Sequence, residues 1–356
     1  MSGTPMKYRN DPGASHRPRR PRPKDMESPV NTLEDNHQYV TDEAEGNGWR
    51  LLLGDSCERL AELPDESIDM SVCSPPFDSL FTYSPSVRDL GNSASRADFL
   101  DHYRFIVEHQ LRVTKPGRIA CIHVQQLTTT KATHGHVGMT DFRGDVIRLF
   151  QGVGWIFHGE TTVWKDPQAQ SIRTKSFSLA FQTKNRDSAS SRPALADYLL
   201  IFRKPGENAV KIAHQADSGE VTNNDWIEWA SPVWTDATEG GWLTDDGHLS
   251  PVWFGIRESD TLNVRVAREA ADERHIAPLQ LEFIRRCILL YSNRGETVLT
   301  PFAGIGSELY VALKNGRCAI GCELKPSYWR TAVDNLRRLE SELNTPTLMD
   351  ELERVV

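Results

Sequence analysis

The sequence predicts an α/β fold whose sheet is mostly parallel. Short runs of apolar or alternating residues, typical of strands, recur along the chain between longer segments with apolar residues at helical spacing. Many of these runs end at glycine or proline. Strands that alternate with helices pack as a parallel sheet covered by helices. A chain of 356 residues is long enough for two or three domains, or for one large domain with an insertion.

The first group of predicted elements ends near residue 204. Residues 50–53 are a short apolar run before Gly54-Asp55, and residues 67–73 alternate before two prolines. Residues 97–113 carry apolar side chains at helical spacing and are stopped by Pro116-Gly117. The predicted strands of this group are 50–53, 67–73, 118–124, 155–164 and 198–202, and its predicted helices are 57–63, 97–113 and 141–150.

A second group of predicted elements begins at Pro278. Its predicted helices are 278–291, 306–314 and 327–339, and its predicted strands are 297–300 and 317–322. Residues 207–274, between the two groups, lack this alternation and are rich in Trp, Asp, Gly and Asn. We therefore expect an insertion between two groups of α/β elements.

Composition and charge exclude several classes of protein. No run of about 18 apolar residues is present, so no transmembrane helix is expected, and residues 1–13 lack the apolar core of a secretory signal. Six scattered cysteines are too few for a disulfide scaffold, which predicts free thiols in a reducing, cytoplasmic environment. A net charge of −8 and a pI of about 5.8 argue against non-specific coating of nucleic acid, but not against a local basic cleft.

Both ends of the chain are predicted to be tails. Residues 1–46 are expected to be disordered, because segment 16–24 is basic and proline-rich and the residues after it are acidic and polar. The basic segment is either a solvated tail or an arm that contacts phosphates. Residues 343–356 are acidic and are expected to fray.

A glycine loop at residues 301–307, Pro-Phe-Ala-Gly-Ile-Gly-Ser, connects a predicted strand to a predicted helix. Glycines let the backbone approach a ligand, and the first turn of a helix offers free N–H groups. Glu323 ends the next predicted strand, where a carboxylate can bind ribose hydroxyls in an open α/β sheet. Leu309 stands where a third glycine would complete a dinucleotide motif, which favours a cofactor without pyrophosphate, such as S-adenosylmethionine. A plain strand–turn–helix corner is the alternative interpretation.

The tetrapeptide Ser74-Pro75-Pro76-Phe77 follows a predicted strand. Its prolines restrict the backbone and remove two N–H donors, so nearby carbonyls act as pure acceptors. A hydroxyl, a carbonyl and an aromatic ring together suit a planar ligand that carries an amino group. A strand-ending turn with a buried Phe is the structural alternative.

With both motifs in one chain, the sequence resembles the amino-group DNA methyltransferases, which modify cytosine N4 or adenine N6. Their catalytic motif, [Asp/Asn/Ser]-Pro-Pro-[Tyr/Phe/Trp], matches residues 74–77, and their cofactor motif, Asp-Pro-Phe-x-Gly-x-Gly, matches residues 301–306 except that Thr300 replaces the Asp. The motif order resembles the β subgroup, and residues 74–92 and 258–281 resemble members carried by phages and prophages. The resemblance covers about residues 49–204 and 275–339.

The resemblance implies a Rossmann-like, circularly permuted sheet of seven strands with helices on both faces. It divides the chain into a catalytic half at 47–205, an inserted target-recognition region at 206–274 and a cofactor-binding half at 275–342, flanked by tails at 1–46 and 343–356. It also implies S-adenosylmethionine as cofactor and double-stranded DNA with a flipped target base as substrate, in the cytoplasm of a bacterial host or a phage-infected cell.

Site residues follow from matching the motifs. The implied catalytic residues are Ser74, Pro75, Pro76 and Phe77. The implied cofactor-binding residues are Asp55, His275, Pro278, Pro301, Phe302, Ala303, Gly304, Gly306, Ser307 and Glu323. The candidates for DNA contacts, from a basic stretch of the catalytic half, are Arg173, Lys175, Arg186 and Arg192. We expect no metal site, because Cys318 and Cys322 lack the second pair that zinc needs, and we expect Cys73 to be a buried thiol.

Ser74 favours cytosine N4 as the target atom, because family members with serine at this position are mostly cytosine-N4 enzymes. Adenine N6 is the alternative, and a catalytically inactive nucleic-acid-binding protein is a more remote one. The same loop also suits RNA or a protein amide. A dinucleotide-dependent oxidoreductase would leave the Pro-Pro-aromatic loop unexplained. The recognition sequence, the oligomeric state and the existence of a partner restriction nuclease stay open.

Overall fold

The computed structural model describes most of the chain between Tyr39 and Thr345, which belongs to one compact unit, 35–356. The residues it describes are 39–77, 86, 88–165, 179, 184–185, 187–214, 219–234, 256, 260–262 and 278–345.

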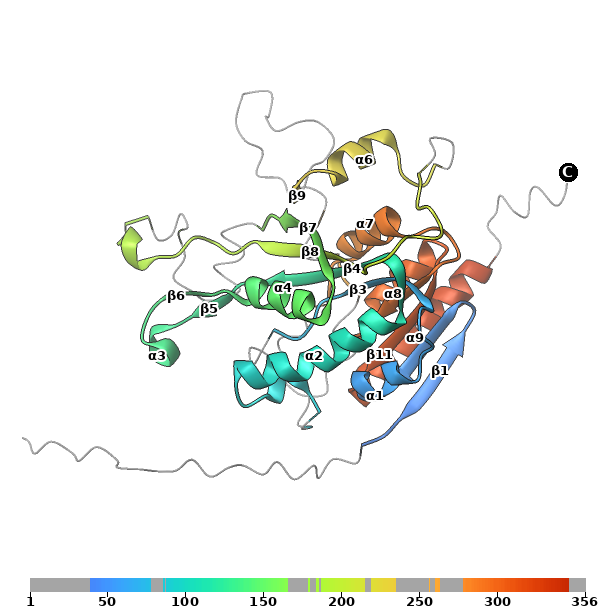
Figure 1. Cartoon of the computed structure of the whole chain (residues 1–356), viewed down its shortest axis with the longest axis horizontal. Helices are drawn as coiled ribbons and strands as arrows, with labels where there is room; N and C mark the ends of the chain where they lie inside the picture. Colours follow the sequence, from blue (N-terminus) through green and yellow to red (C-terminus); the bar gives the residue numbers. More distant parts are fainter. Residues whose placement is uncertain are drawn as a thin grey trace, which may run out of the picture. The chain divides into compact units, whose positions relative to one another are not determined.

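Within the described residues, one sheet has nine strands, in the spatial order β1-β2-β11-β10-β3-β4-β8-β7-β9 (Figure 1). Their bounds are β1 Asp42–Gly46, β2 Trp49–Leu53, β3 Ile68–Cys73, β4 Thr114–Gln125, β7 Ile156–Val163, β8 Asp197–Arg203, β9 Val233–Trp234, β10 Thr297–Thr300 and β11 Cys318–Glu323. The five strands from β2 to β4 are mutually parallel. Strand β8 is antiparallel to both of its neighbours, and β1 is antiparallel to β2. A separate antiparallel pair consists of β5 Leu127–Thr129 and β6 Gly138–Thr140.

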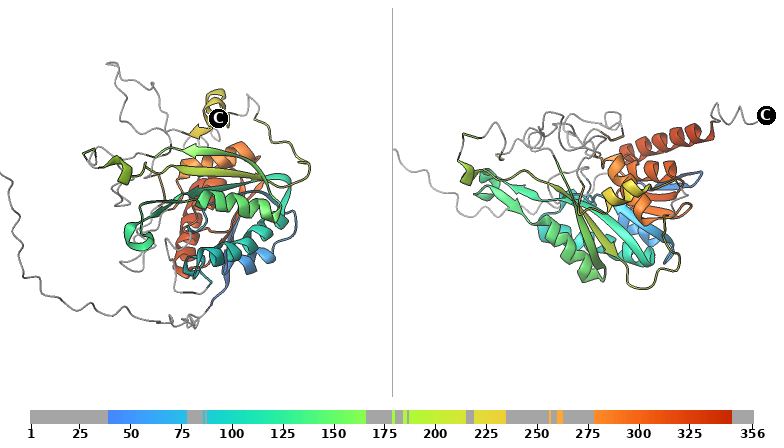
Figure 2. Two further views of the ribbon diagram at one scale, coloured as in Figure 1. Left: turned by 60° about the vertical axis from the view of Figure 1, so that its left-hand side comes forward. Right: turned by 90° about the horizontal axis from the view of Figure 1, so that it is seen from above.

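Helices cover both faces of the large sheet. The described helices are α1 Ser56–Ala61, α2 Arg96–Val113, α3 Lys131–His134, α4 Phe142–Val153, α6 Asn223–Trp229, α7 Leu281–Tyr291, α8 Ser307–Lys314 and α9 Pro326–Asn344, with short 3₁₀ turns at Leu90–Asn92 and Ser188–Ser190. One hydrophobic core joins α7, α8 and α9 to the sheet, and a second joins α1, α2 and α4 to it. Figure 2 shows these two groups of helices on opposite sides of the strands.

Strand β4 shows why one sheet serves two cores. Ile119 and Cys121 belong to the core of α7, α8 and α9, whereas Ala120 and Ile122 belong to the core of α1, α2 and α4. Successive side chains of a strand point to opposite faces, so a strand buried on both faces is apolar throughout. The sequence shows this pattern at residues 119–122, Ile-Ala-Cys-Ile.

The helices begin and end at residues suited to those positions. Ser95 accepts a hydrogen bond from Asp98 N at 3.2 Å at the start of α2, and Asp141 accepts one from Gly144 N at 3.0 Å at the start of α4. Gly154 ends α4 in the left-handed region, with φ of +116°. These caps fix the direction in which the chain enters and leaves each helix.

The α/β class, the mostly parallel sheet and its helical faces are confirmed. Strands β2, β3, β4, β7, β8, β10 and β11 lie where the sequence predicts strands. The described sheet has nine strands instead of the expected seven, because β1 and β9 are added at its two edges. None of the described helices combines the length and the apolar character that a membrane span requires.

The predicted tail boundary at residue 46 is wrong, because β1 lies inside that range. The sequence of this strand, Asp-Glu-Ala-Glu-Gly, is polar, and only Ala44 is buried. An edge strand is held by backbone pairing with one neighbour, so composition does not reveal it. The boundary at residue 342 is also slightly off, because α9 continues to Asn344.

The predicted insertion at 206–274 is partly built onto the sheet. Within it, β9 pairs in parallel with β7, and Thr162 N donates to Pro232 O at 2.8 Å. Trp229 and Trp234 are buried in the core of α7, α8 and α9. The Trp234 indole N–H donates to Trp229 O at 2.9 Å, and its ring packs edge-on against Phe283. These two tryptophans anchor the start of the region.

We expect Trp234→Ala to lower the free energy of unfolding by about 3–5 kcal/mol, because it leaves a large cavity in the core. Trp226→Ala is the matched control: that side chain is half exposed, and its removal should change stability by no more than about 0.5 kcal/mol. Urea unfolding followed by far-UV circular dichroism measures both. Equal effects of the two substitutions would show that β9 does not stabilise the sheet.

Candidate active site

Two loops that are more than 200 residues apart in sequence meet at one edge of the sheet. Strands β3 and β10 are parallel neighbours, so their carboxyl ends lie side by side. Ser74-Pro75-Pro76-Phe77 follows β3, and the glycine loop follows β10. The loops after β2 and β11 join them, and Ser56 Oγ donates to Pro301 O at 2.6 Å. This edge is where open α/β sheets bind ligands.

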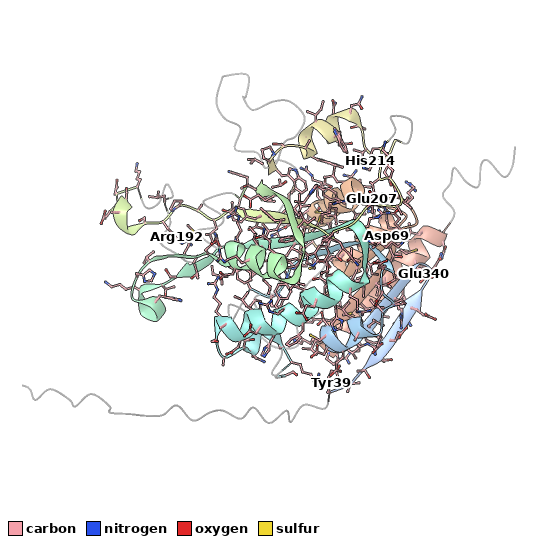
Figure 3. The ribbon with its side chains drawn as sticks, in the orientation of Figure 1. Tyr39, Asp69, Arg192, Glu207, His214 and Glu340 are labelled. Atoms are coloured by element: carbon pink, nitrogen blue, oxygen red, sulfur yellow. The ribbon has the colours of Figure 1, made fainter. Side chains whose placement is uncertain are left out.

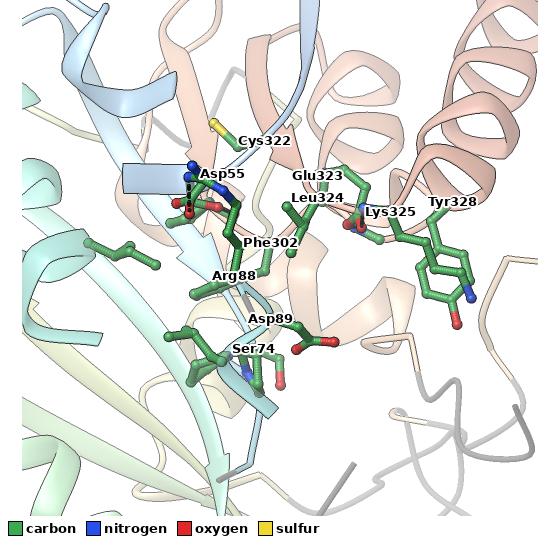
Figure 4. A pocket seen from close by; sticks show the side chains of 18 of the residues that line it. Asp55, Ser74, Arg88, Asp89, Phe302, Cys322, Glu323, Leu324, Lys325 and Tyr328 are labelled. Carbon is green, nitrogen blue, oxygen red and sulfur yellow. Dashed lines mark hydrogen bonds and ion pairs between the residues drawn. The ribbon is translucent and has the colours of Figure 1, made fainter. Parts of the chain in front are cut away.

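A cavity of about 380 Å³ opens at this edge (Figure 4), within the range of roughly 300–1,000 Å³ for small-molecule sites. The predicted site residues that line it are Asp55, Ser74, Pro75, Pro76, Phe77, Pro278, Pro301, Phe302, Ala303, Gly304, Ser307 and Glu323. Gly306 lies just behind the wall, and His275 is outside the described residues. The structure therefore brings nearly all of these residues together.

The glycine loop needs its two glycines for conformational reasons. Gly304 and Gly306 have φ values of +53° and +88°, in the left-handed region that side chains disfavour. A Cβ atom on Gly306 would also lie 3.1 Å from Ala332 Cβ of α9. Gly306 precedes the first turn of α8, and no side chain caps that turn. The N-cap position therefore supplies no side-chain acceptor to the first turn of α8, whose residues Ser307 and Glu308 line the cavity.

Glu323 is held in place by the loops around it. Its carboxylate accepts hydrogen bonds from Gly304 N at 2.7 Å and Lys325 N at 2.8 Å. Burial nevertheless raises the pKa of this carboxyl to about 7. The two oxygens are thus fixed at the cavity wall, at the end of β11, with the remaining lone pairs available to a ligand.

Glu308, in the first turn of α8, is a cavity residue that sequence reasoning missed. Its side chain is 5% exposed, and it has no side-chain partner within the described part of the chain. Burial, with the nearby Glu323 carboxyl adding to it, raises the pKa of Glu308 to about 8. A charged residue at a buried position of an apolar helix was the signal for it. A buried carboxyl without a counterion suits a cationic ligand.

Asp55 has a structural role at the rim of the cavity. It caps α1 by accepting from Cys57 N at 2.9 Å, and its other oxygen lies 3.3 Å from an Arg88 guanidinium nitrogen. Arg88 also pairs with Glu58 at 2.6 Å and lies over the Tyr39 ring. Figure 4 shows Arg88 beside Asp55 at the cavity wall. The sequence did not indicate Arg88.

Ser74 is hydrogen-bonded to a side chain that the sequence analysis did not single out. Ser74 Oγ lies 3.0 Å from His123 Nδ1, and His123 Nε2 lies 2.9 Å from Asp197 Oδ2. Asp197 is also 2.9 Å from Lys165 Nζ. A histidine directly after the apolar run 119–122 of strand β4 was the available signal for this cluster.

Phe77 is half-buried and takes part in both the cavity wall and the core. Its ring packs edge-on against Phe142, with centroids 5.9 Å apart, and is tilted against His123 at 6.0 Å. The Phe77 ring therefore has packing neighbours in the protein, in addition to the face that it offers to a ligand in the cavity. Cys73 is fully buried, as expected, and burial raises the pKa of its thiol.

Of the four candidates for DNA contacts, one lies within the described residues. Arg173, Lys175 and Arg186 lie outside the described residues. Arg192 (Figure 3) is 7% exposed and donates to Pro193 O at 3.0 Å. A buried guanidinium is at odds with a place on an exposed basic surface, and a contact between Arg192 and DNA stays a prediction. Basic residues in a stretch of sequence need not face solvent.

Three features meet at one cavity of an open α/β sheet. They are a glycine loop, a carboxylate at the position that binds ribose hydroxyls, and a Ser-Pro-Pro-Phe loop. Together these features are typical of amino-group methyltransferases. A family model for N6/N4 DNA methylases matches residues 68–334, and the chain therefore belongs to that family. It is an S-adenosylmethionine-dependent DNA methyltransferase of the N4 or N6 type.

Related proteins cover most of the chain. The type II methyltransferase M.MthZI of Methanothermobacter thermautotrophicus is 26% identical over 317 residues, 82% of this chain and 78% of that protein. M.MjaI of Methanocaldococcus jannaschii is 24% identical over 301 residues, 78% and 88% of the two chains.

Two solved structures show the same fold. A putative DNA modification methylase of Thermus thermophilus, solved with S-adenosyl-L-methionine bound, has a TM-score of 0.58 at 21% identity, over 83% of this chain and 94% of that one. The PvuII DNA methyltransferase, described as cytosine-N4-specific, has a TM-score of 0.53 at 15% identity, over 84% and 92%.

We expect S-adenosylmethionine binding to release protons and to tighten as the pH rises. In the free protein, with pKa values of about 8 for Glu308 and about 7 for Glu323, both carboxyls are partly protonated near neutral pH. A sulfonium cation in the cavity favours their ionised forms, so the bound protein holds fewer protons. Affinity should therefore increase between about pH 6 and 8.

Calorimetric titration in two buffers of different ionisation enthalpy measures this proton release. Glu308→Gln and Glu323→Gln should each reduce it, whereas Glu62→Gln, which changes an exposed carboxylate outside the cavity, should leave it unchanged. An enthalpy that is the same in both buffers would contradict a position of the bound cofactor beside these two carboxyls.

Proposed function

We propose that this enzyme methylates the exocyclic N4 nitrogen of cytosine in double-stranded DNA at a specific sequence. The observation that carries the proposal is the position of Ser74: its hydroxyl, from the loop after β3, lines the same cavity as the glycine loop. The proposal also rests on the family resemblance, because members with serine before the two prolines are mostly cytosine-N4 enzymes, and Ser74 holds that position here.

The cofactor would be held by the loops after β10 and β11. We assign the ribose hydroxyls to Glu323, the backbone approach to Gly304 and Gly306, and the positive charge to Glu308. The residues present fit the group, because the cavity has the required size and a buried carboxyl that forms no ion pair within the described residues. When bound, S-adenosylmethionine supplies an electrophilic methyl group.

Catalysis in this site depends on positioning. The amino nitrogen of cytosine is a poor nucleophile, because its lone pair is delocalised into the ring. Ser74 Oγ and the Pro75 carbonyl would accept its hydrogens and so localise the lone pair toward the methyl group. No covalent bond between base and protein is required, and alignment of the two reactants supplies most of the rate enhancement.

The target base has to leave the DNA stack to reach this cavity. Phe77, on the cavity wall next to Ser74, offers an aromatic face for the flipped base. Pro76, which also lines the wall, restricts the backbone that places the ring. The base would then lie between Phe77 and the cofactor-binding loop.

Mass spectrometry of nucleosides tests the choice of target atom. DNA methylated by the purified enzyme is digested to nucleosides, and we expect N4-methyldeoxycytidine. N6-methyldeoxyadenosine in its place would refute the cytosine assignment, while the fold and the cofactor would stand. DNA that carries neither product after incubation with S-adenosylmethionine would argue for another acceptor, such as RNA.

Two substitutions at Phe77 separate stacking from packing. Phe77→Tyr keeps the ring and should retain most of the activity. Phe77→Leu keeps apolar contact with Phe142 but lacks an aromatic face, and we expect kcat/KM to fall by about 5- to 150-fold, the scale of one base–aromatic stack. Methyl transfer assays with thermal melting measure both effects. Equal activity of the two variants would show that only packing matters here.

A further inference from the structure

A chain of buried polar groups lies behind Ser74, on the side away from the cavity. From Ser74 Oγ it runs to His123 and on to Asp197, with distances of 3.0 and 2.9 Å. Asp197 also accepts from Lys165 Nζ at 2.9 Å and from Gln125 Nε2 at 2.7 Å. His123, Lys165 and Asp197 are 7%, 5% and 4% exposed, and none of them lines the cavity.

The charge on Asp197 fixes the donor and acceptor roles in this chain. Burial acts to raise the pKa of Asp197, but Lys165 and His123 outweigh it and hold the pKa well below its usual range. An ionised carboxylate is an acceptor only. His123 Nε2 must therefore carry the proton that it shares with Asp197.

Asp197 does not need a charged ring as its partner, because Lys165 Nζ lies 2.9 Å from the same carboxylate. A single proton on His123, at Nε2, therefore satisfies the bond to Asp197. In a neutral ring that is protonated at Nε2, Nδ1 is an acceptor. The Ser74 hydroxyl is then the donor of the 3.0 Å bond.

We propose that His123 and Asp197 are positioning residues, which hold the Ser74 proton away from the cavity so that Ser74 Oγ presents only lone pairs to the substrate. A free hydroxyl can either donate or accept a hydrogen bond. A hydroxyl whose proton is bound to His123 can only accept from the substrate. The loop then binds an amino group and rejects a ring nitrogen that lacks a proton. This inference rests on the proposed role of Ser74 as an acceptor.

The surrounding fold supports a fixed arrangement. Strands β4 and β8 are antiparallel neighbours, in a register that pairs Gln125 with Asp197. The His123 ring is packed edge-on against Phe283 of α7, with centroids 5.2 Å apart. Backbone pairing and ring packing thus restrict both partners, as a group that orients another side chain requires.

A matched pair of substitutions at His123 tests the proposal. The amide of Asn reaches the place of the imidazole Nδ1, beside Ser74, whereas the longer Gln reaches the place of Nε2, beside Asp197. Both variants are polar and lack the ring. We expect His123→Gln to lower kcat by about tenfold or more, the scale of one lost positioning hydrogen bond, and His123→Asn to retain clearly more activity. Equal kcat values for the two variants would overturn the proposal.

Combining substitutions at His123 and Ser74 distinguishes a positioning role of His123 from a purely structural one. If His123 acts through Ser74, then His123→Gln should lower kcat in the wild-type background but not in the Ser74→Ala background. The affinity for S-adenosylmethionine should be unchanged in both, because His123 does not line the cavity. Additive losses of kcat would contradict the proposal.

Asp197→Asn gives an independent route should the His123 variants fail to fold. An amide that donates to Nε2 would leave Nδ1 protonated and turn the Ser74 proton toward the cavity, so kcat should fall while thermal melting still shows a folded enzyme. Unchanged kcat would overturn the proposal.

The assay counts labelled methyl groups transferred from S-adenosylmethionine to unmethylated DNA of mixed sequence, whichever base accepts them. A wrong choice of base therefore appears only in the nucleoside analysis of the wild-type enzyme. A wrong positioning role appears only in the comparison of the variants. The two failures are thus distinguishable.

Discussion

The parallel pairing of β10 with β3 is the contact on which the active site depends. It places the ends of two strands side by side although more than 200 residues separate them in sequence, and the paired register is short, from Val298 with Met70 to Leu299 with Ser71. A buried cluster reinforces it at the other end of these strands. Asp69 Oδ2 accepts from Thr297 N at 3.0 Å, and Arg118 Nη1 donates to Glu296 at 3.0 Å.

This cluster joins three neighbouring strands through charges that are almost entirely buried. The Arg118 side chain is 2% exposed, and loss of either carboxylate partner would leave it poorly compensated. The charged cluster lies at the starts of β3 and β10, and the apolar strands run from it to the cavity. Rigidity at one end of the sheet therefore fixes the relative position of the two loops at the other end.

The cavity itself contains groups that are unfavourable in the free protein. Glu308 and Glu323 are acids with raised pKa values, and Ser307 Oγ is buried without a partner in the described structure. Such groups destabilise the free enzyme, and in the proposed binding mode a cationic, hydroxyl-bearing cofactor would supply their partners. Thr300, in place of the family's Asp, carries no charge, and Glu308 provides a buried carboxyl nearby.

The sequence by itself determined the α/β class and the two loops that carry the chemistry. Residues 119–122 are recognisable as part of a buried strand because all four are apolar, and residues 301–307 are recognisable as a ligand loop because their glycines lie between a predicted strand and a predicted helix. Local patterns of this kind depend on chain neighbours, and so they are visible in a single sequence.

Only the tertiary structure decided which residues from distant parts of the chain contact or support these loops. His123 and Asp197 are 74 positions apart, and they meet because β8 returns antiparallel to β4. Strand β1 is held by backbone pairing that its polar sequence does not indicate. Arg192 has the charge of a DNA contact, but it is buried. Such contacts form between segments that are distant in the sequence. The order of residues along the chain therefore does not directly indicate contacts, burial or charge pairing.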